Sequence, residues 1–193
     1  MVAPSNLDLA FVDHTPETAP DASRAALRAT AAHLGFLPSA MARLAESPSV
    51  TAAFGRLMAL WEACSLALVE REVVTLTVAH RAGCEVCVAM HSAIMARAVA
   101  DAPLLEALRA QRPLADGRLE ALRQFTRAVL ASHGGVTDAE LSAFLAAGFS
   151  RQQALDVVLG VGTYTLSTTA NRLTRAPLDR PLEPFAWTAE SRG

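Results

Sequence analysis

The feature that most constrains the fold of this chain is a series of helix start and stop signals. Between them, apolar and polar residues do not alternate over the length of a strand. Asp21 opens a segment whose apolar residues recur on one face, and Gly35 closes it. Ser47 and Pro48 then combine an N-cap residue with a proline at the first helical position. The apolar residues that follow keep helical spacing, so a second long helix is expected there.

The rest of the chain continues this pattern. Periodicity predicts further helices over residues 70–82, 84–100 and 118–132. Two capping boxes, which begin at Thr137 and Ser150, predict two more, and the second should reach about Leu173. Because no segment alternates with period two over the length of a strand, the sequence predicts an all-α, multi-helical bundle.

The two ends of the chain differ from the helical middle in their proline content. Prolines are concentrated in residues 1–20 and 176–193, where they disfavour continuous helices. We therefore expect an N-terminal extension over residues 1–20, a helical domain over residues 21–175 and an extended C-terminal tail over residues 176–193. Phe185 and Trp187 of that tail need an apolar place to dock.

Charge and hydropathy exclude several classes of function. Seventeen Lys and Arg against nineteen Asp and Glu give a formal net charge of −2, so no electrostatic field selects nucleic acid or an anionic membrane. No run approaches the roughly 18 consecutive apolar residues of a membrane span, and the first residues lack the basic start of a signal peptide. We expect a cytoplasmic protein that binds neither nucleic acid nor membrane, in a compartment that keeps thiols reduced.

Residues 83–91, GCEVCVAMH, place two cysteines and a histidine at helical spacing. Gly83 ends one helix, so Cys84 is expected at or near the N-terminus of the next, where a partial positive charge favours a thiolate. Cys84 and Cys87 are three residues apart, and His91 follows Cys87 by four, so the three share one helical face. A histidine one turn from a cysteine can take or return its proton.

Glu72 lies in the preceding helical segment, among residues that are mostly apolar. If the two helices pack as an antiparallel pair, the Glu72 carboxylate comes near the cysteines and is suited to act as a general base. The residues alone leave redox chemistry, a metal site and inert core thiols open. A zinc site would need a fourth ligand from Cys64, His80 or Glu72. A thioredoxin-like site is excluded, because the βαβ unit beside its C-x2-C pair is missing.

The sequence resembles the AhpD-type alkylhydroperoxidase signature of the carboxymuconolactone decarboxylase-like superfamily at Glu72, Cys84, Cys87 and His91, which stand in E-x11-C-x2-C-x3-H spacing. The segments LGFLPSAMARLAESPSVTAAF and TANRLTRAPLD resemble the flanks of AhpD-like proteins, so the similarity covers roughly residues 35–180. In AhpD a second histidine precedes the later cysteine, whereas this chain has Val86 there.

What the resemblance implies is an α-helical array that assembles into trimers or hexamers and reduces organic hydroperoxides as a thiol peroxidase. Cys87 would attack the peroxide and become a sulfenic acid. Cys84 would be the proton donor and resolving thiol, closing a Cys84–Cys87 disulfide, and Glu72 and His91 would form the proton relay. The reaction would need no cofactor or metal, and a thiol or protein reductant would supply the electrons.

Two other functions stay open at this point. One is a carboxymuconolactone decarboxylase-like lyase, although lactone decarboxylation does not need a vicinal dithiol. The other is a metal-binding or non-catalytic helical oligomer, since a fold does not dictate a function. In either case we expect an obligate homo-oligomer, because few charges interrupt residues 51–69 and several helices are apolar on more than one face.

The remaining candidate residues are expected to serve the structure. Cys64 should be a buried, inert core thiol. His80 should be a packed or interface histidine rather than a catalytic one. Met90 and Met95 should fill gaps in the core, or line an apolar peroxide pocket.

Overall fold

The computed structural model describes residues 10–189 of the 193, and within them the chain is built from helices alone. The elements are α1 (Asp21–Leu34), α2 (Ser39–Leu44), α3 (Pro48–Glu62), α4 (Leu68–Ala82), α5 (Glu85–Ala98), α6 (Ala102–Arg109), α7 (Gly117–Ser132), α8 (Asp138–Ala146), α9 (Arg151–Leu173) and the 3-10 helix η1 (Arg180–Phe185). No strand occurs in this part of the chain, so the all-α prediction is confirmed. Residues 1–9 of the expected N-terminal extension and 190–193 of the expected tail lie outside the described residues.

The helix boundaries follow the signals in the sequence. Ser47 accepts a hydrogen bond from the Val50 N–H at the start of α3, and the capping boxes at Thr137 and Ser150 open α8 and α9. Gly35 ends α1 with a left-handed backbone conformation. Helices α2, α6 and η1 were not expected from the periodicity, and they are among the shortest of the elements.

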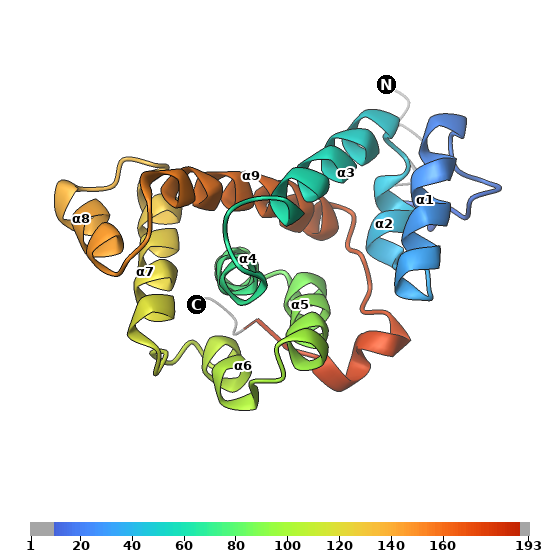
Figure 1. The fold of residues 1–193 in the computed structure, drawn as a ribbon. Helices are drawn as coiled ribbons and strands as arrows, with labels where there is room; N and C mark the ends of the chain where they lie inside the picture. Colours follow the sequence, from blue (N-terminus) through green and yellow to red (C-terminus); the bar gives the residue numbers. More distant parts are fainter. Residues whose placement is uncertain (1–9, 190–193) are drawn as a thin grey trace, which may run out of the picture.

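Helix α4 runs through the middle of the molecule. In Figure 1 it is seen end-on, with α9 above it, α7 to one side, and α5 and α6 below. Its apolar residues Val73, Val74 and Leu76 are fully buried, because helices pack against it on several sides. Polar residues on α4 are therefore held in the interior, and Glu72 is one of them.

Helices α1, α2 and α3 form a group beside the central helices (Figure 1). A small apolar cluster of its own holds α1 and α2 together and includes Ala19, Leu27 and Ala45. Helix α3 also packs along α9, which joins this group to the rest of the core.

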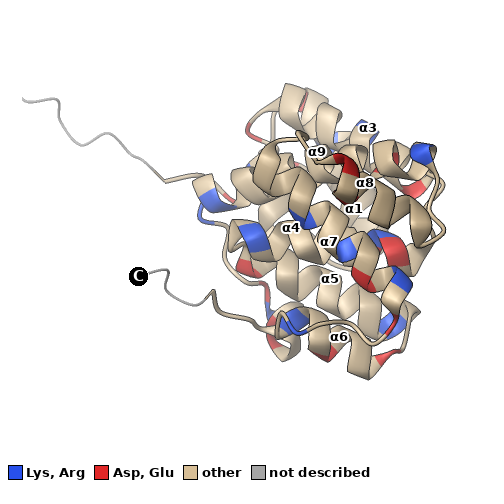
Figure 2. Ribbon diagram, turned by 90° about the vertical axis from the view of Figure 1, so that its left-hand side faces the viewer, with Lys and Arg blue, Asp and Glu red and all other residues tan. Residues whose placement is uncertain are grey.

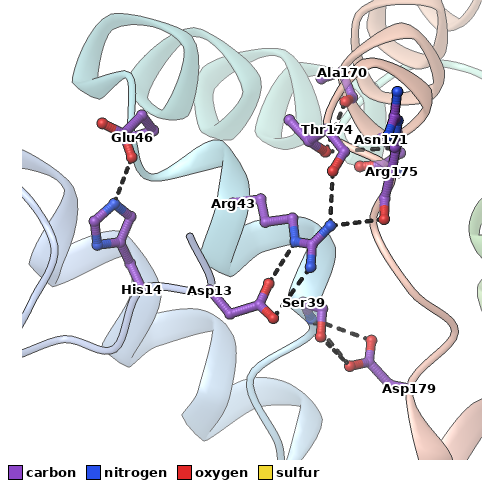
Figure 3. Close-up of polar contacts among 10 residues, drawn as sticks. All are labelled: Asp13, His14, Ser39, Arg43, Glu46, Ala170, Asn171, Thr174, Arg175 and Asp179. Carbon is purple, nitrogen blue, oxygen red and sulfur yellow. Dashed lines mark hydrogen bonds and ion pairs between the residues drawn. The ribbon is translucent and has the colours of Figure 1, made fainter. Parts of the chain in front are cut away.

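Polar contacts fasten this group to the segment that follows α9 (Figure 3). The Arg43 guanidinium forms an ion pair with Asp13 at 2.6 Å and donates to the carbonyl oxygens of Thr174 and Arg175, each at 2.7 Å. At the other end of α2, the Asp179 carboxylate accepts hydrogen bonds from the backbone N–H and hydroxyl of Ser39. Both ends of α2 are thereby tied to the chain beyond α9.

Positively and negatively charged residues are interspersed along the ribbon in Figure 2, which views the molecule from the side of α7 and α8. In the described part of the chain, none of the helices combines the length and the apolar character that crossing a bilayer requires.

Candidate active site

The turn between α4 and α5 sets the position of the cysteines. Gly83 ends α4 at φ 64°, in the left-handed region that glycine adopts without steric cost. Cys84 is then the N-cap of α5, and Cys87 lies in the first turn. Both thiols are buried. The prediction that Cys84 stands at a helix N-terminus is confirmed.

The two thiols share a hydrogen bond, which moves their pKa values in opposite directions. The hydrogen bond from Cys87 lowers the pKa of Cys84 to about 7. The same bond, together with burial, raises the pKa of Cys87 well above its ordinary value. The pair therefore gives up its first proton near neutrality, and the remaining proton lies between two sulfurs with Cys84 carrying more of the charge.

Helix α9 supplies two polar side chains that the sequence reasoning missed. The Asn171 amide donates to the Cys87 sulfur at 3.2 Å and lies 3.9 Å from the Cys84 sulfur. The Ser167 hydroxyl lies 3.8 Å from the Cys87 sulfur. Asn171 falls inside the flank TANRLTRAPLD, but only the packing of α9 brings it to the cysteines, 84 positions away in the chain. A buried amide that donates to sulfur stabilises the thiolate.

Glu72 and His91 form a buried pair beside the cysteines. The Glu72 carboxylate lies 2.8 Å from Nδ1 of His91, and both side chains are less than a tenth exposed. This bond fixes Nδ1 as the proton-bearing nitrogen and leaves Nε2 available to the site. The ring of Tyr164 packs edge-on against His91, with 4.9 Å between centroids. The packing of α4 against α5 thus brings Glu72 to His91.

A hollow of about 280 Å³ opens over Cys87. Its apolar lining comes from four helices and includes Met41, Leu44, Phe54, Met58, Met90 and Ile94. Cys87, His91 and Asn171 line the same hollow, together with Val86 at the place where AhpD has a histidine. Cys84 instead lines a separate, smaller opening with Arg172 and Arg175. The two sulfurs of the pair therefore face different openings.

The other candidate residues lie elsewhere. Cys64 is half-buried just beyond the end of α3, where burial raises the pKa of its thiol, so it is less enclosed than expected. His80 is buried on α4 against Trp187, which gives that tail residue its docking place. Met95 is buried in the core. Within residues 10–189 no three His, Cys, Asp or Glu side chains gather closely enough to bind a metal ion.

Residues 47–128 match the sequence profile of the carboxymuconolactone decarboxylase family. This segment contains Glu72, both cysteines of the pair and His91. No curated protein matches the chain in sequence.

Several solved structures share the fold over nearly the whole chain. An uncharacterised peroxidase-related protein with an alkylhydroperoxidase AhpD core, from Ralstonia eutropha JMP134, has a TM-score of 0.78 at 20% identity, covering 92% of this chain and 96% of that one. A second uncharacterised peroxidase-related protein, from Silicibacter sp. TM1040, has a TM-score of 0.75 at 20% identity, covering 93% and 94%. The debrominase Bmp8 in complex with 2,3,4-tribromopyrrole has a TM-score of 0.75 at 16% identity, covering 94% and 96%. The fold of this chain is therefore AhpD-like.

Proposed function

We propose that this chain, whose residues 47–128 match the carboxymuconolactone decarboxylase family and whose fold is AhpD-like, is a thiol-dependent peroxidase that reduces organic hydroperoxides. The observation that carries the proposal is the reduced Cys84–Cys87 pair at the start of α5, with Cys87 beneath an apolar hollow and a Glu72–His91 pair beside it. The hollow suits a substrate with an apolar body, and the thiol supplies the nucleophile.

Cys87 is the attacking sulfur, because it is the one that faces the apolar hollow. When the shared proton passes from Cys87 to Cys84, the Cys87 thiolate forms and is held by the Asn171 amide. That thiolate attacks the terminal peroxide oxygen. The O–O bond breaks, the peroxide is reduced by two electrons to an alcohol, and Cys87 is oxidised to a sulfenic acid.

The departing alkoxide needs a proton. In this scheme Nε2 of His91 accepts the proton that the dithiol releases when the thiolate forms, and then donates it to the alkoxide. Glu72 holds Nδ1 of His91, so Nε2 is the nitrogen that exchanges a proton within the hollow. Positioned acid–base groups of this kind contribute about 10²–10⁴-fold to a rate. Glu72→Gln and His91→Ala should each reduce peroxide turnover on that scale.

Cys84 completes the cycle as the resolving thiol. Its sulfur attacks the Cys87 sulfenic acid, a Cys84–Cys87 disulfide forms, and water leaves with the hydroxyl oxygen. A thiol or protein reductant then returns two electrons and two protons to the pair. Cys84 lines its own opening beside Arg172 and Arg175, which gives a reductant a route separate from that of the peroxide.

Two serine variants test the assignment of roles. With one equivalent of an organic hydroperoxide, the native chain should lose two free thiols and keep Cys64, as counted by mass spectrometry. Cys84→Ser should complete one turnover and leave a trappable sulfenic acid on Cys87, whereas Cys87→Ser should consume no peroxide. If Cys87→Ser stays active while Cys84→Ser does not, the two roles are reversed. If neither thiol changes, the chain is not a thiol peroxidase.

Reductive debromination is the second candidate, because a solved debrominase shares this fold over 94% of the chain. The same dithiol could deliver two electrons to a carbon–bromine bond, releasing bromide and a proton as the disulfide forms. Bromide release from 2,3,4-tribromopyrrole, measured beside hydroperoxide consumption, separates the two candidates. Peroxidase activity predicts fast hydroperoxide consumption and no bromide.

A further inference from the structure

A second and larger hollow lies away from the dithiol. It has a volume of about 660 Å³ and is bounded by α4, the end of α6, α7 and the C-terminal segment. Its polar lining consists mainly of Thr77, His80, Arg81, Arg109, Gln111 and Arg127. None of the residues that line the hollow over Cys87 lines this one. The proposed peroxidase chemistry makes no use of it.

His80 is a buried polar group that the described protein leaves unsatisfied. Its side chain is only 7% exposed, and neither ring nitrogen has a hydrogen-bond partner within residues 10–189. Burial, together with the positive charges of Arg109 and Arg127, lowers the pKa of His80 to about 4. Trp187 packs edge-on against the ring at 4.5 Å and lines the same hollow. An unsatisfied polar ring at the wall of a hollow indicates that something polar occupies the space.

Two of the guanidinium groups are bound in the described structure by neutral groups. Arg109 donates to the Ser92 hydroxyl and to the carbonyl oxygens of Phe185 and Ala186. Arg127 donates to the side-chain oxygen of Gln111. Burial lowers the pKa of both guanidinium groups, which means that the site is unfavourable for their positive charge. Among residues 10–189, no Asp or Glu lines the hollow.

Glu120 on α7 favours the positive charge of Arg127, but its carboxylate is already bound by other groups. Glu120 is bound by the guanidinium of Arg123 and by the Leu114 N–H. Arg123 also adds to the positive potential at Arg127. The hollow therefore combines three arginines, an unsatisfied ring and an aromatic wall, and the acid nearby on α7 is already paired.

We propose that this hollow is a binding site for a phosphate group, either free or carried by a small organic molecule. Guanidinium groups recognise oxyanions through paired hydrogen bonds. A phosphate dianion compensates more of the charge of the three arginines that line the hollow than a single carboxylate does. His80 provides a further hydrogen bond, Gln111 holds the Arg127 guanidinium, and Trp187 gives an organic substituent an apolar surface to contact.

Trp187 provides a local readout for this site. The full-length protein is titrated with inorganic phosphate and with phenyl phosphate at constant ionic strength, and tryptophan fluorescence is followed. Both should produce a saturable change, and Trp187→Phe should abolish it while calorimetry still detects binding. The other tryptophan, Trp61, is buried against Tyr164 and should not respond. Tighter binding of phenyl phosphate would identify an organic phosphate as the ligand, and equal binding would identify the free ion.

Arg127→Gln is the test variant, and Arg56→Gln, at an exposed position on α3, is the matched control. Losing one charge-assisted hydrogen-bonding group should weaken phosphate binding about tenfold or more in Arg127→Gln. Arg56→Gln should bind as the native chain does, and both variants should keep their peroxide turnover. The proposal is wrong if sodium chloride produces the same change, if Arg127→Gln binds phosphate with native affinity, or if benzoate binds as tightly as phenyl phosphate.

Discussion

At the scale of single residues, the site depends on one proton shared by Cys84 and Cys87. The hydrogen bond from Cys87 places the pKa of Cys84 at about 7. The thiolate is therefore present above that pH and is lost as the pH falls below it. We expect the rate of alkylation by a neutral reagent to rise about tenfold per pH unit below pH 7 and to level off above it.

The thiolate absorbance measured in the ultraviolet should follow the same curve. Its first step should be centred near pH 7, and a second should follow at a pH well above the ordinary range for cysteine. Cys64→Ser serves as the control, because that thiol is separate from the pair and its removal should leave the first step in place. A single titration at the ordinary cysteine pKa would contradict the shared proton.

Asn171 is the residue on which we expect the Cys87 thiolate to depend most directly. Its amide donates to the Cys87 sulfur at 3.2 Å, and hydrogen bonds to charged groups are worth about 1.5–3 kcal/mol. Asn171→Leu should therefore slow peroxide reduction by roughly 10–100-fold and move the first thiol titration to higher pH. Ser167→Ala is the matched control on the same helix, since its longer contact of 3.8 Å should contribute less. Equal effects from the two variants would count against this role.

The sequence could predict one half of this site and not the other. Spacing alone pointed to Cys84, Cys87 and His91, because the three lie within three turns of one helix. Glu72 could also be predicted as a site residue, because a single turn at Gly83 connects its helix to the helix of the cysteines. Asn171 could not be found in this way. It reaches the cysteines only through the packing of α9, which no local periodicity encodes.

At the scale of elements, the contact between α3 and α9 depends on a glycine. A side chain at Gly160 would place its Cβ 2.5 Å from the ring of Trp61, which is fully buried. Gly160→Ala should therefore destabilise the protein by about 1–3 kcal/mol, as overpacked cores do. Gly162 lies on the same helix with open space around it, so Gly162→Ala should be neutral or stabilising by about 0.4–1 kcal/mol. Denaturant unfolding compares them, and an equal loss in both would refute the steric explanation.

The helices that periodicity missed are short, and they differ in whether a local signal marks their start. Helix α6 starts after Asp101, whose carboxylate accepts from the Leu104 N–H, with Pro103 in the first turn. That combination could have been recognised in the sequence. Helix α2 has no such internal cap. Asp179, 140 positions further along the chain, accepts from its Ser39 N–H, so tertiary structure stabilises its N-terminus.

At the scale of the whole molecule, α4 is buried in the core, and some apolar side chains of the helices around it are exposed to solvent. Leu155 and Val158 lie three residues apart on α9, and Leu155 is 71% exposed. Leu60 on α3 is also exposed, and the Ser65 N–H in the loop after α3 donates to the Asp156 carboxylate of α9. Apolar side chains that gather on one surface are typical of a protein–protein interface.

We expect this surface, formed by Leu60, Leu155 and Val158, to join copies of the chain into an obligate homo-oligomer. The native protein should scatter light as a multiple of the 20.4 kDa chain at micromolar concentration. The double variant Leu155→Glu and Val158→Glu should shift it to a smaller species, because two carboxylates would have to be buried without partners. Arg97→Glu, which changes an exposed charge on α5, is the control and should keep the native mass. A native protein that scatters as a single chain would overturn the prediction, and an unchanged mass in the double variant would place the interface elsewhere.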